Sequence, residues 1–280
     1  MYLTCQTTCI NTHLMKTKVN PTLRNSSLNS LCENFSLQSF LRSFCRDFSA
    51  DPRVSLTKKK LTINLSNNKI ITATLQFYSS IGFHHFDNVQ YVNHPLTLLE
   101  LAKILSTSFF NLQEKNHFVS RLKMSQIHLQ EILEYQQNKI ATGLDHEKSY
   151  IASEQALYLG HPFHPYPKCK EGMSETERKD YSPEFSTSFQ LWWIPIKKDQ
   201  LYTNLNENLS LTHTIKTLLE KELPSLDLSQ LEKENFTLLP FHPYQWNTLK
   251  DSKLFQNKLD EKSIQRPIKG LHQWHPLSSL

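Results

Sequence analysis

Apolar residues recur every three or four positions in several segments of the first half of the chain, which is the spacing of one face of a helix. In the first of these segments the face includes Phe35, Leu41 and Phe44. The helices that this spacing predicts lie over residues 28–48, 95–110, 112–137 and 146–159.

Strands are predicted where apolar and polar residues alternate or β-branched and aromatic residues gather. Residues 61–65 and 70–77 are such segments, and Ser66-Asn67-Asn68-Lys69 between them predicts a hairpin. A short strand is expected at 91–92. The second half adds a capping box at Ser174 and Glu177, which predicts a helix start, strands over 189–196 and 236–241, and a helix over 212–223.

These elements predict an α+β protein with a seam near residue 158. Residues 1–158 are rich in predicted helices, with a polar start over 1–27, and residues 159–280 carry most of the unusual motifs. We therefore expect one domain over 1–158 and a second, mixed α/β domain over 159–280.

Composition narrows the class of protein. A hydrophobic content of 38% supports a core, and the net charge of +5 is spread out, with Lys58-Lys59-Lys60 as the one basic run. This balance does not favour nucleic-acid binding. Five cysteines without a CxxC pair indicate reduced thiols, and there is neither a secretory signal nor a run of 18 apolar residues. We expect a cytoplasmic protein with no membrane partner.

The five glycines exclude the common phosphate loops. No GxGxxG and no GxxxxGK[ST] can be drawn through Gly82, Gly143, Gly160, Gly172 and Gly270, so neither a dinucleotide fingerprint nor a P-loop is present. HExxH and GxSxG are also absent. A bound nucleotide would have to be held by side chains.

One segment, residues 160–172, concentrates candidate chemistry; we call it the His-Pro loop. Two histidines, two lysines and three prolines lie between Gly160 and Gly172. Prolines fix φ and restrict the preceding residue, so we expect a stiff, extended loop. In such a loop Lys168 and Lys170 can point the same way, and with His161 and His164 they suit an anion.

Two further His-Pro elements follow, at residues 239–246 and 274–280. Ser278 and Ser279 in the last one offer hydroxyls and amides for a further phosphate contact. Two other interpretations of the histidines stay open. His161, His164 and Cys169 have a spacing that zinc could use, although four recognisable ligands are lacking, and the histidines can also serve as ordinary hydrogen-bonded loop residues.

The order of these motifs resembles a known family. Gly160-His161-Pro162-x-His164-Pro165-x-x-Lys168, then His242-Pro243-x-Gln245, then Ser278-Ser279, is similar to the IucA/IucC family of NRPS-independent siderophore synthetases. The resemblance covers roughly residues 149–280, while residues 1–148 fit only by length and position.

The resemblance implies an ATP-dependent, adenylate-forming ligase of siderophore biosynthesis. A carboxylate of citrate or a related acid attacks the α-phosphate of ATP, pyrophosphate leaves, and an amine or hydroxyl takes the acyl group, with Mg²⁺ as the metal. Catalytic roles fall on Lys168 and His161, and nucleotide or structural support falls on His242 and Gln245. The residues that would bind ATP or phosphate are His161, His164, Lys168, Lys170, Ser278 and Ser279.

The family fold implies a thumb-like domain over 1–158 and a fingers-like domain over 159–280, followed by a palm. The chain departs from the pattern in having Lys170 where arginine is usual, Tyr244 for tryptophan and Leu277 for threonine. It also stops one residue before the family's Arg-Thr, so we expect a truncated N-terminal half that does not adenylate citrate alone.

Two alternatives to an active half-synthetase stay open. One is an inactive remnant that binds nucleotide or pairs with an intact synthetase, and the other is a small zinc- or nucleic-acid-binding protein. For the assembly, the alternatives are a homo-oligomer or pairing with a separate C-terminal half. In the site itself we expect His161, His164 and Lys168 on one exposed face of a cleft, with Ser279 approaching it.

Overall fold

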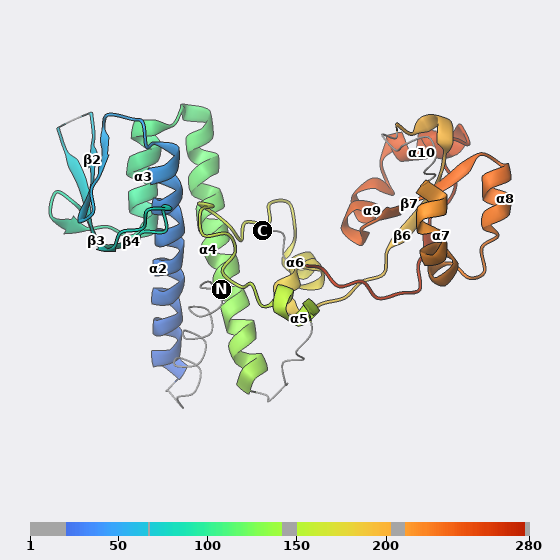
Figure 1. Cartoon of the computed structure of the whole chain (residues 1–280), viewed down its shortest axis with the longest axis horizontal. Coiled ribbons are helices and arrows are strands. Elements are labelled where there is room, and N and C mark those ends of the chain that lie inside the picture. Colours follow the sequence, from blue (N-terminus) through green and yellow to red (C-terminus); the bar gives the residue numbers. More distant parts are fainter. Residues whose placement is uncertain (1–20, 67, 142–149, 203–210, 278–280) are drawn as a thin grey trace. The chain divides into compact units, whose positions relative to one another are not determined.

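The computed structural model describes residues 21–66, 68–141, 150–202 and 211–277, which form two compact α+β units (Figure 1). The first unit ends at Met173 and the second spans Ser174–Leu277. The boundary lies later than the predicted seam at residue 158. The His-Pro loop belongs to the first unit because it is hydrogen bonded to a helix of that unit, through Lys168 N and Ser125 Oγ.

Helices make up most of the first unit. They are α2 (Pro21–Asp47), α3 (Leu98–Phe109), α4 (Leu112–Ala141) and α5 (Tyr150–Gln155). The long α2 and α4 run side by side, with α3 next to α4 (Figure 1). The first three predicted helices are confirmed. The fourth is shorter than predicted within the described residues, because the chain turns before the His-Pro loop.

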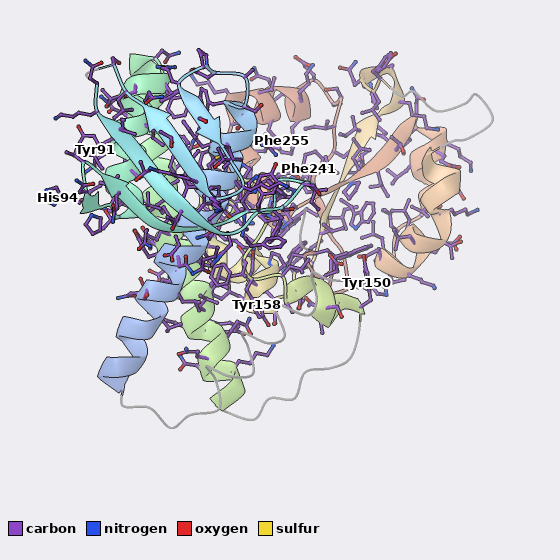
Figure 2. The ribbon with its side chains drawn as sticks, turned by 60° about the vertical axis from the view of Figure 1, so that its left-hand side comes forward. Tyr91, His94, Tyr150, Tyr158, Phe241 and Phe255 are labelled. Atoms are coloured by element: carbon purple, nitrogen blue, oxygen red, sulfur yellow. The ribbon has the colours of Figure 1, made fainter. Side chains whose placement is uncertain are left out.

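The sheet of the first unit is antiparallel, in the order β1-β2-β3-β4-β5. Its strands are β1 (Val54–Leu56), β2 (Lys60–Asn64), β3 (Ile70–Phe77), β4 (His85–Tyr91) and β5 (His94–Pro95). The predicted hairpin is confirmed, with Leu61 opposite Ala73 and Asn64 opposite Ile70. Tyr91 pairs with His94 across a two-residue turn (Figure 2).

Alternation along the strands directs one face of this sheet into the core. Leu61, Ile63, Ile71 and Ala73 are buried there, as expected for a sheet with one solvated face. They pack with the apolar stripe of α2 and with α3. The helical members of this cluster are Phe40, Leu41, Phe44, Leu98, Leu101, Ala102 and Leu105.

A buried glutamine joins α2 to the edge of β4. Gln38 Nε2 donates to Phe86 O at 2.8 Å, and Phe86 N donates to Gln38 Oε1 at 2.9 Å. Phe86 lies beyond the short pairing of β4 with β5, which involves only Gln90 and Tyr91 on β4. The Gln38 amide therefore replaces a missing strand partner, which a buried sheet edge needs.

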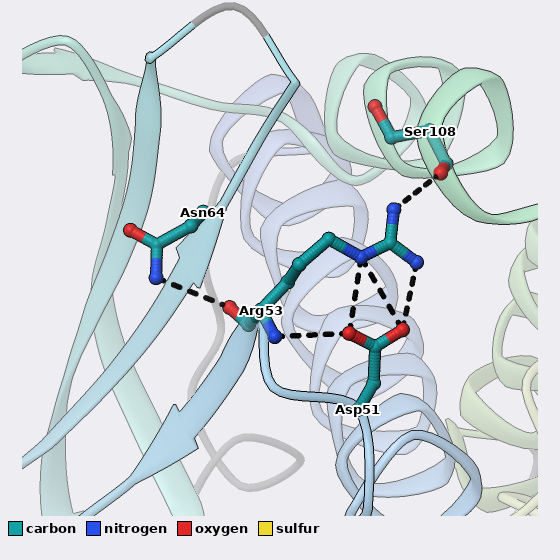
Figure 3. A network of polar contacts seen from close by, with 4 residues as sticks. All are labelled: Asp51, Arg53, Asn64 and Ser108. Carbon is teal, nitrogen blue, oxygen red and sulfur yellow. Dashed lines mark hydrogen bonds and ion pairs between the residues drawn. The ribbon is translucent and has the colours of Figure 1, made fainter.

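An arginine joins the start of β1 to the end of α3 (Figure 3). The Arg53 guanidinium grips both carboxylate oxygens of Asp51, and its Nη1 donates to Ser108 O at 2.9 Å. It also lies 3.8 Å from the centre of the Phe109 ring, and Asn64 donates to Arg53 O. A carbonyl in the last turn of α3 thus gains a cationic donor, which suits a helix C-terminus.

The second unit is built on a three-stranded antiparallel sheet in the order β7-β6-β8. Its strands are β6 (Trp192–Lys197), β7 (Phe236–Phe241) and β8 (Ile268–Lys269). Pro195 in the central strand accepts from Gln265 N at 2.9 Å, and β8 itself pairs only with Trp192 and Trp193, so the N–H that proline lacks is not part of a β8 ladder. The predicted strands over 189–196 and 236–241 are confirmed in type, the first one starting later.

Short helices surround this sheet. They are α6 (Glu175–Tyr181), α7 (Leu211–Glu222), α8 (Leu228–Lys233), α9 (Pro243–Leu249) and α10 (Lys253–Asp260), together with 3-10 turns at Pro183–Phe185 and Lys198–Gln200. The predicted capping box of Ser174 and Glu177 opens α6. The core gathers around the fully buried Trp193, with Leu219, Leu223, Leu231, Phe236 and Leu238.

We expect Gln38→Leu to destabilise the first unit. The change keeps an apolar side chain in place but leaves Phe86 N–H and C=O without the amide, at about 1–3 kcal/mol for each buried group without a partner. Urea unfolding of the two proteins measures this. Gln76→Leu, on the exposed part of β3, is the matched control. An equal effect of the two changes would contradict the role of Gln38.

The pair of Asp51 and Arg53 predicts a pH dependence of stability. The hydrogen bonds from Arg53 lower the pKa of Asp51 to about 2, below the ordinary value of about 4. A lowered carboxyl pKa stabilises the folded state above the unfolded value and loses that effect as the pH falls from about 4 to 2. Unfolding free energies of the wild type and Asp51→Asn should therefore converge over that range, and parallel curves would refute the coupling.

Candidate functional site

The His-Pro loop follows α5 and is bracketed by two glycines with positive φ. Gly160 has φ +75° and Gly172 has φ +85°. A Cβ on Gly160 would lie 2.8 Å from Pro167 Cβ and 3.1 Å from Lys168 Cε. The loop therefore closes tightly onto its own start, and a larger residue at position 160 would force it open.

The loop is built of turns rather than the extended segment predicted, and each of its two histidines opens one. Phe163 N donates to His161 Nδ1 and Tyr166 N donates to His164 Nδ1, both at 3.2 Å. His164 N also donates to His161 O. The prediction was wrong because it counted the restraint that proline places on φ and overlooked that an imidazole can accept the next available N–H.

These turns fix how the two imidazoles can act. A ring nitrogen that accepts from the backbone carries no proton, so a neutral His161 or His164 holds its proton on Nε2. Both side chains are exposed, and each therefore presents an N–H donor away from its turn. Partial burial of the ring, then nearby His161 and Arg46, lower the pKa of His164 despite the bond from Tyr166, which favours the neutral donor form.

Lys168 is buried, contrary to the prediction of an exposed cation. Its side chain is 3% exposed, and Nζ donates to Leu157 O at 2.9 Å. Two residues of α4 hold its backbone: Lys168 N donates to Ser125 Oγ, and His128 Nδ1 donates to Lys168 O. The expected shared face of Lys168 and Lys170 does not form, because Lys170 is only half-buried.

Aromatic contacts fix the loop to the rest of the first unit. The Phe163 ring lies 6.0 Å from Phe83 and touches the space beside Gly82. Tyr166 lies edge-on to His164 at 4.7 Å and to Phe118 of α4 at 5.8 Å. The sequence analysis did not single out Phe163 or Tyr166, although both alternate with the histidines.

A metal site is not formed in the part of the chain that the structure describes. No group of three or more His, Cys, Asp or Glu side chains there could hold a metal ion. Cys169 instead donates to Met124 Sδ at 3.6 Å, and burial raises the pKa of its thiol. Among these residues His161, His164 and Cys169 therefore give no support to the zinc interpretation.

The second motif, in the second unit, opens a helix. His242 is the N-cap of α9, with Pro243 in the first turn. Tyr244 N donates to His242 Nδ1 at 3.1 Å, and His242 N donates to Gln245 Oε1 at 3.3 Å. The His242 ring packs against Tyr181 and Phe189, and burial lowers its pKa.

The third motif is tied to the second within the same unit. Phe189 and Trp274 exchange two backbone hydrogen bonds, of 2.9 and 2.8 Å, and the Phe189 ring lies 4.2 Å from His242. Trp274 Nε1 donates to Glu222 Oε1 at 2.7 Å. Ser278 and Ser279 lie outside the described residues.

Glu222 is a buried carboxylate that the sequence analysis missed. It is fully buried at the end of α7, where the helix dipole disfavours negative charge. Its carboxylate accepts from Trp274 Nε1 and from His272 N. A Cβ on Gly270 would collide with Glu222 Oε2, so this glycine makes room for the anchor.

Known proteins match this chain over the region that contains the three motifs. The profile of the IucA / IucC family matches residues 149–280. The chain is 33% identical over 204 residues to L-2,3-diaminopropanoate–citrate ligase of Staphylococcus aureus, a match that covers 68% of this chain and 33% of that enzyme. It is 25% identical to N(2)-citryl-N(6)-acetyl-N(6)-hydroxylysine synthase of Vibrio mimicus, over 79% of this chain and 39% of that enzyme.

Solved structures share the fold. ATP-bound aerobactin synthetase IucA from a hypervirulent pathotype of Klebsiella pneumoniae has a TM-score of 0.66 at 22% identity, over 88% of this chain and 45% of that one. Petrobactin biosynthesis protein AsbB from Bacillus anthracis has a TM-score of 0.65 at 15% identity, over 90% and 43%.

The chain spans about a third of the length of these two curated relatives. Its relatives are siderophore-synthesis enzymes by sequence, and its fold is that of the synthetase structures. On the match over residues 149–280 and these relatives, the chain belongs to the IucA/IucC family.

Proposed function

We propose that this chain is the phosphate-facing part of an ATP-dependent siderophore synthetase that joins citrate, or a related carboxylic acid, to an amine or hydroxyl. The observation that carries the proposal is the pair of His-Pro turns, each of which uses Nδ1 and leaves the imidazole Nε2–H without a hydrogen bond to the described residues. Family membership supports the same reaction class, since the relatives include citrate ligases. The first unit would be the thumb-like region and the second the fingers-like region.

The reaction would run in two steps. A carboxylate oxygen of the acid attacks the α-phosphorus of ATP, and the bond to the leaving pyrophosphate breaks. The amine or hydroxyl then attacks the acyl carbon, AMP leaves, and the nucleophile gives up its proton. Negative charge grows on phosphate oxygens in the first step, and fixed donors lower the barrier by stabilising it.

Each predicted site residue then has a distinct part. His161 and His164 would donate to phosphate oxygens, and the half-buried Lys170 of the same loop would supply a point charge. Lys168 acts through position, because its ammonium holds the chain at Leu157. His242 and Gln245 support the second motif as a helix cap, and Ser278 and Ser279 would add a phosphate contact.

The His-Pro loop suits the negative charge of ATP. Glu171, the one acidic residue of the loop, pairs with Arg121 at 2.7 Å, so its charge is compensated and does not oppose a phosphate. Mg²⁺ finds no comparable group among the described residues. We therefore assign no ligand to the metal and derive no step from it. When bound, it would neutralise charge on the leaving pyrophosphate.

Asparagine variants separate the donor role from the turn. In the synthetase that contains this chain, His161→Asn and His164→Asn keep a side-chain acceptor for the turn and remove the Nε2–H donor. We expect each to lower citrate-dependent ATP–pyrophosphate exchange by about 10²–10³-fold, as for loss of one preorganised donor, with a small change in melting temperature. The control is His94→Asn, because His94 belongs to an exposed His-Pro pair in the sheet (Figure 2). Full activity of both variants would refute the donor role.

Lys168 is expected to be needed for stability. Lys168→Met keeps the length of the side chain but removes the donor to Leu157 O, at about 1–3 kcal/mol for a buried group without a partner. The exchange rate per folded molecule should fall far less than in His161→Asn. Lys170→Met, with the same change at a half-buried position, is the control for stability. A stable Lys168→Met protein without exchange activity would instead place the ammonium on a phosphate.

A further inference from the structure

Two arginines of helix α2, Arg42 and Arg46, lie one turn apart near the His-Pro loop. Like charges four residues apart on a helix repel and destabilise it. Nearby carboxylates or a bound anion would relieve this repulsion. Both arginines belong to the first unit, as do the His-Pro loop and the loop before β4.

Arg42 is held by a carbonyl and an aromatic ring. Its Nε donates to His84 O at 2.7 Å, and its guanidinium lies 4.0 Å from the centre of the Phe83 ring. Burial lowers the pKa of Arg42 to about 10. Within the described residues no carboxylate forms an ion pair with it, so its terminal amino groups keep donors for a ligand.

Arg46 extends this group of cations to the His-Pro loop. Its guanidinium lies 5.9 Å from the centre of the Phe163 ring and pairs with Asp47 at 3.0 Å. That pair is weak because both side chains are more than half exposed. Phe163 in turn lies 6.0 Å from Phe83, the ring on which Arg42 lies, so one aromatic cluster supports both arginines.

The positive charge of these arginines lowers the pKa of the neighbouring imidazoles, in addition to the effect of burial. Burial and then Arg42 lower the pKa of His84. Arg46 and His161 add to the effect of burial at His164. Asp47 is the one acid that the described contacts bring to this group, so donors converge here with little negative charge to meet them.

We propose that Arg42 and Arg46 of α2, together with His164, form a subsite for a multiply charged oxyanion. The ligand chemistry is a phosphoryl group or a polycarboxylate, which arginine binds through its planar fork of N–H donors. His164 adds its outward Nε2–H. The inference rests on the proposed function for the role of His164, and it assigns new ligand contacts to a helix outside the three motifs.

Direct binding tests the subsite. Calorimetric titrations of the purified chain with inorganic pyrophosphate and with citrate, in separate experiments at constant ionic strength, identify which oxyanion binds. Arg42→Gln and Arg46→Gln should each weaken that binding by tenfold or more. Lys58→Gln removes one exposed cation from the same unit and should leave the affinity within about twofold, because exposed charges are screened by salt.

The outcomes separate this inference from the proposed function. If Arg42→Gln unfolds, Arg46→Gln decides alone, because Arg46 is exposed and holds no buried group. Binding that is lost in His161→Asn but unchanged in both arginine variants would overturn the subsite and leave the proposed function standing. Absence of binding of either anion would also overturn it, while the exchange assay on the complete synthetase would still judge the function.

Discussion

The hydrogen bond from a backbone N–H to histidine Nδ1 across an intervening proline is the constraint on which the candidate site depends. It recurs at His161, His164 and His242. Proline cannot donate, so the first N–H after it needs an acceptor. The imidazole that supplies one loses the freedom to place its proton and its ring, and its second nitrogen becomes a fixed donor.

The same bond has different consequences in the two units. In the first unit it exposes His161 and His164 on a loop that Gly160 and Phe163 hold down. In the second unit it caps α9, and the ring packs between Tyr181 and Phe189. The first motif can therefore contact a ligand directly, whereas the second mainly positions β7 and α9.

Buried charges hold the remaining parts of the site in place. Lys168 fixes the end of the His-Pro loop to Leu157, and Glu222 fixes Trp274 at the start of the third motif. Burying an ion is costly unless hydrogen bonds compensate for lost water. The hydrogen-bond partners of Lys168 and Glu222 are Leu157 O and Trp274 Nε1, which lie beside or within the motifs. The stability of each unit is therefore coupled to the geometry of its motif.

Sequence alone determined the elements and the family. Periodicity located α2, α3 and α4 and the hairpin of β2 and β3, because burial of one face dictates the spacing of apolar residues. The order of the His-Pro motifs indicated the IucA/IucC family, because motif order is a property of the sequence and needs no coordinates. The capping box at Ser174 was readable for the same reason, as all its partners lie within four residues.

Only the tertiary structure decided which of the charged residues face solvent. Lys168 and Lys170 look equivalent in sequence, but the packing of the loop on α4 buries the first. His94-Pro95 also matches the local pattern, yet Leu96 N donates to Val89 O in the sheet instead of to His94. Arg42 and Glu222 gave no local signal, because their partners are 42 and 52 residues away in the chain. Contacts over such distances depend on how the elements pack, which the sequence pattern of any one element does not contain.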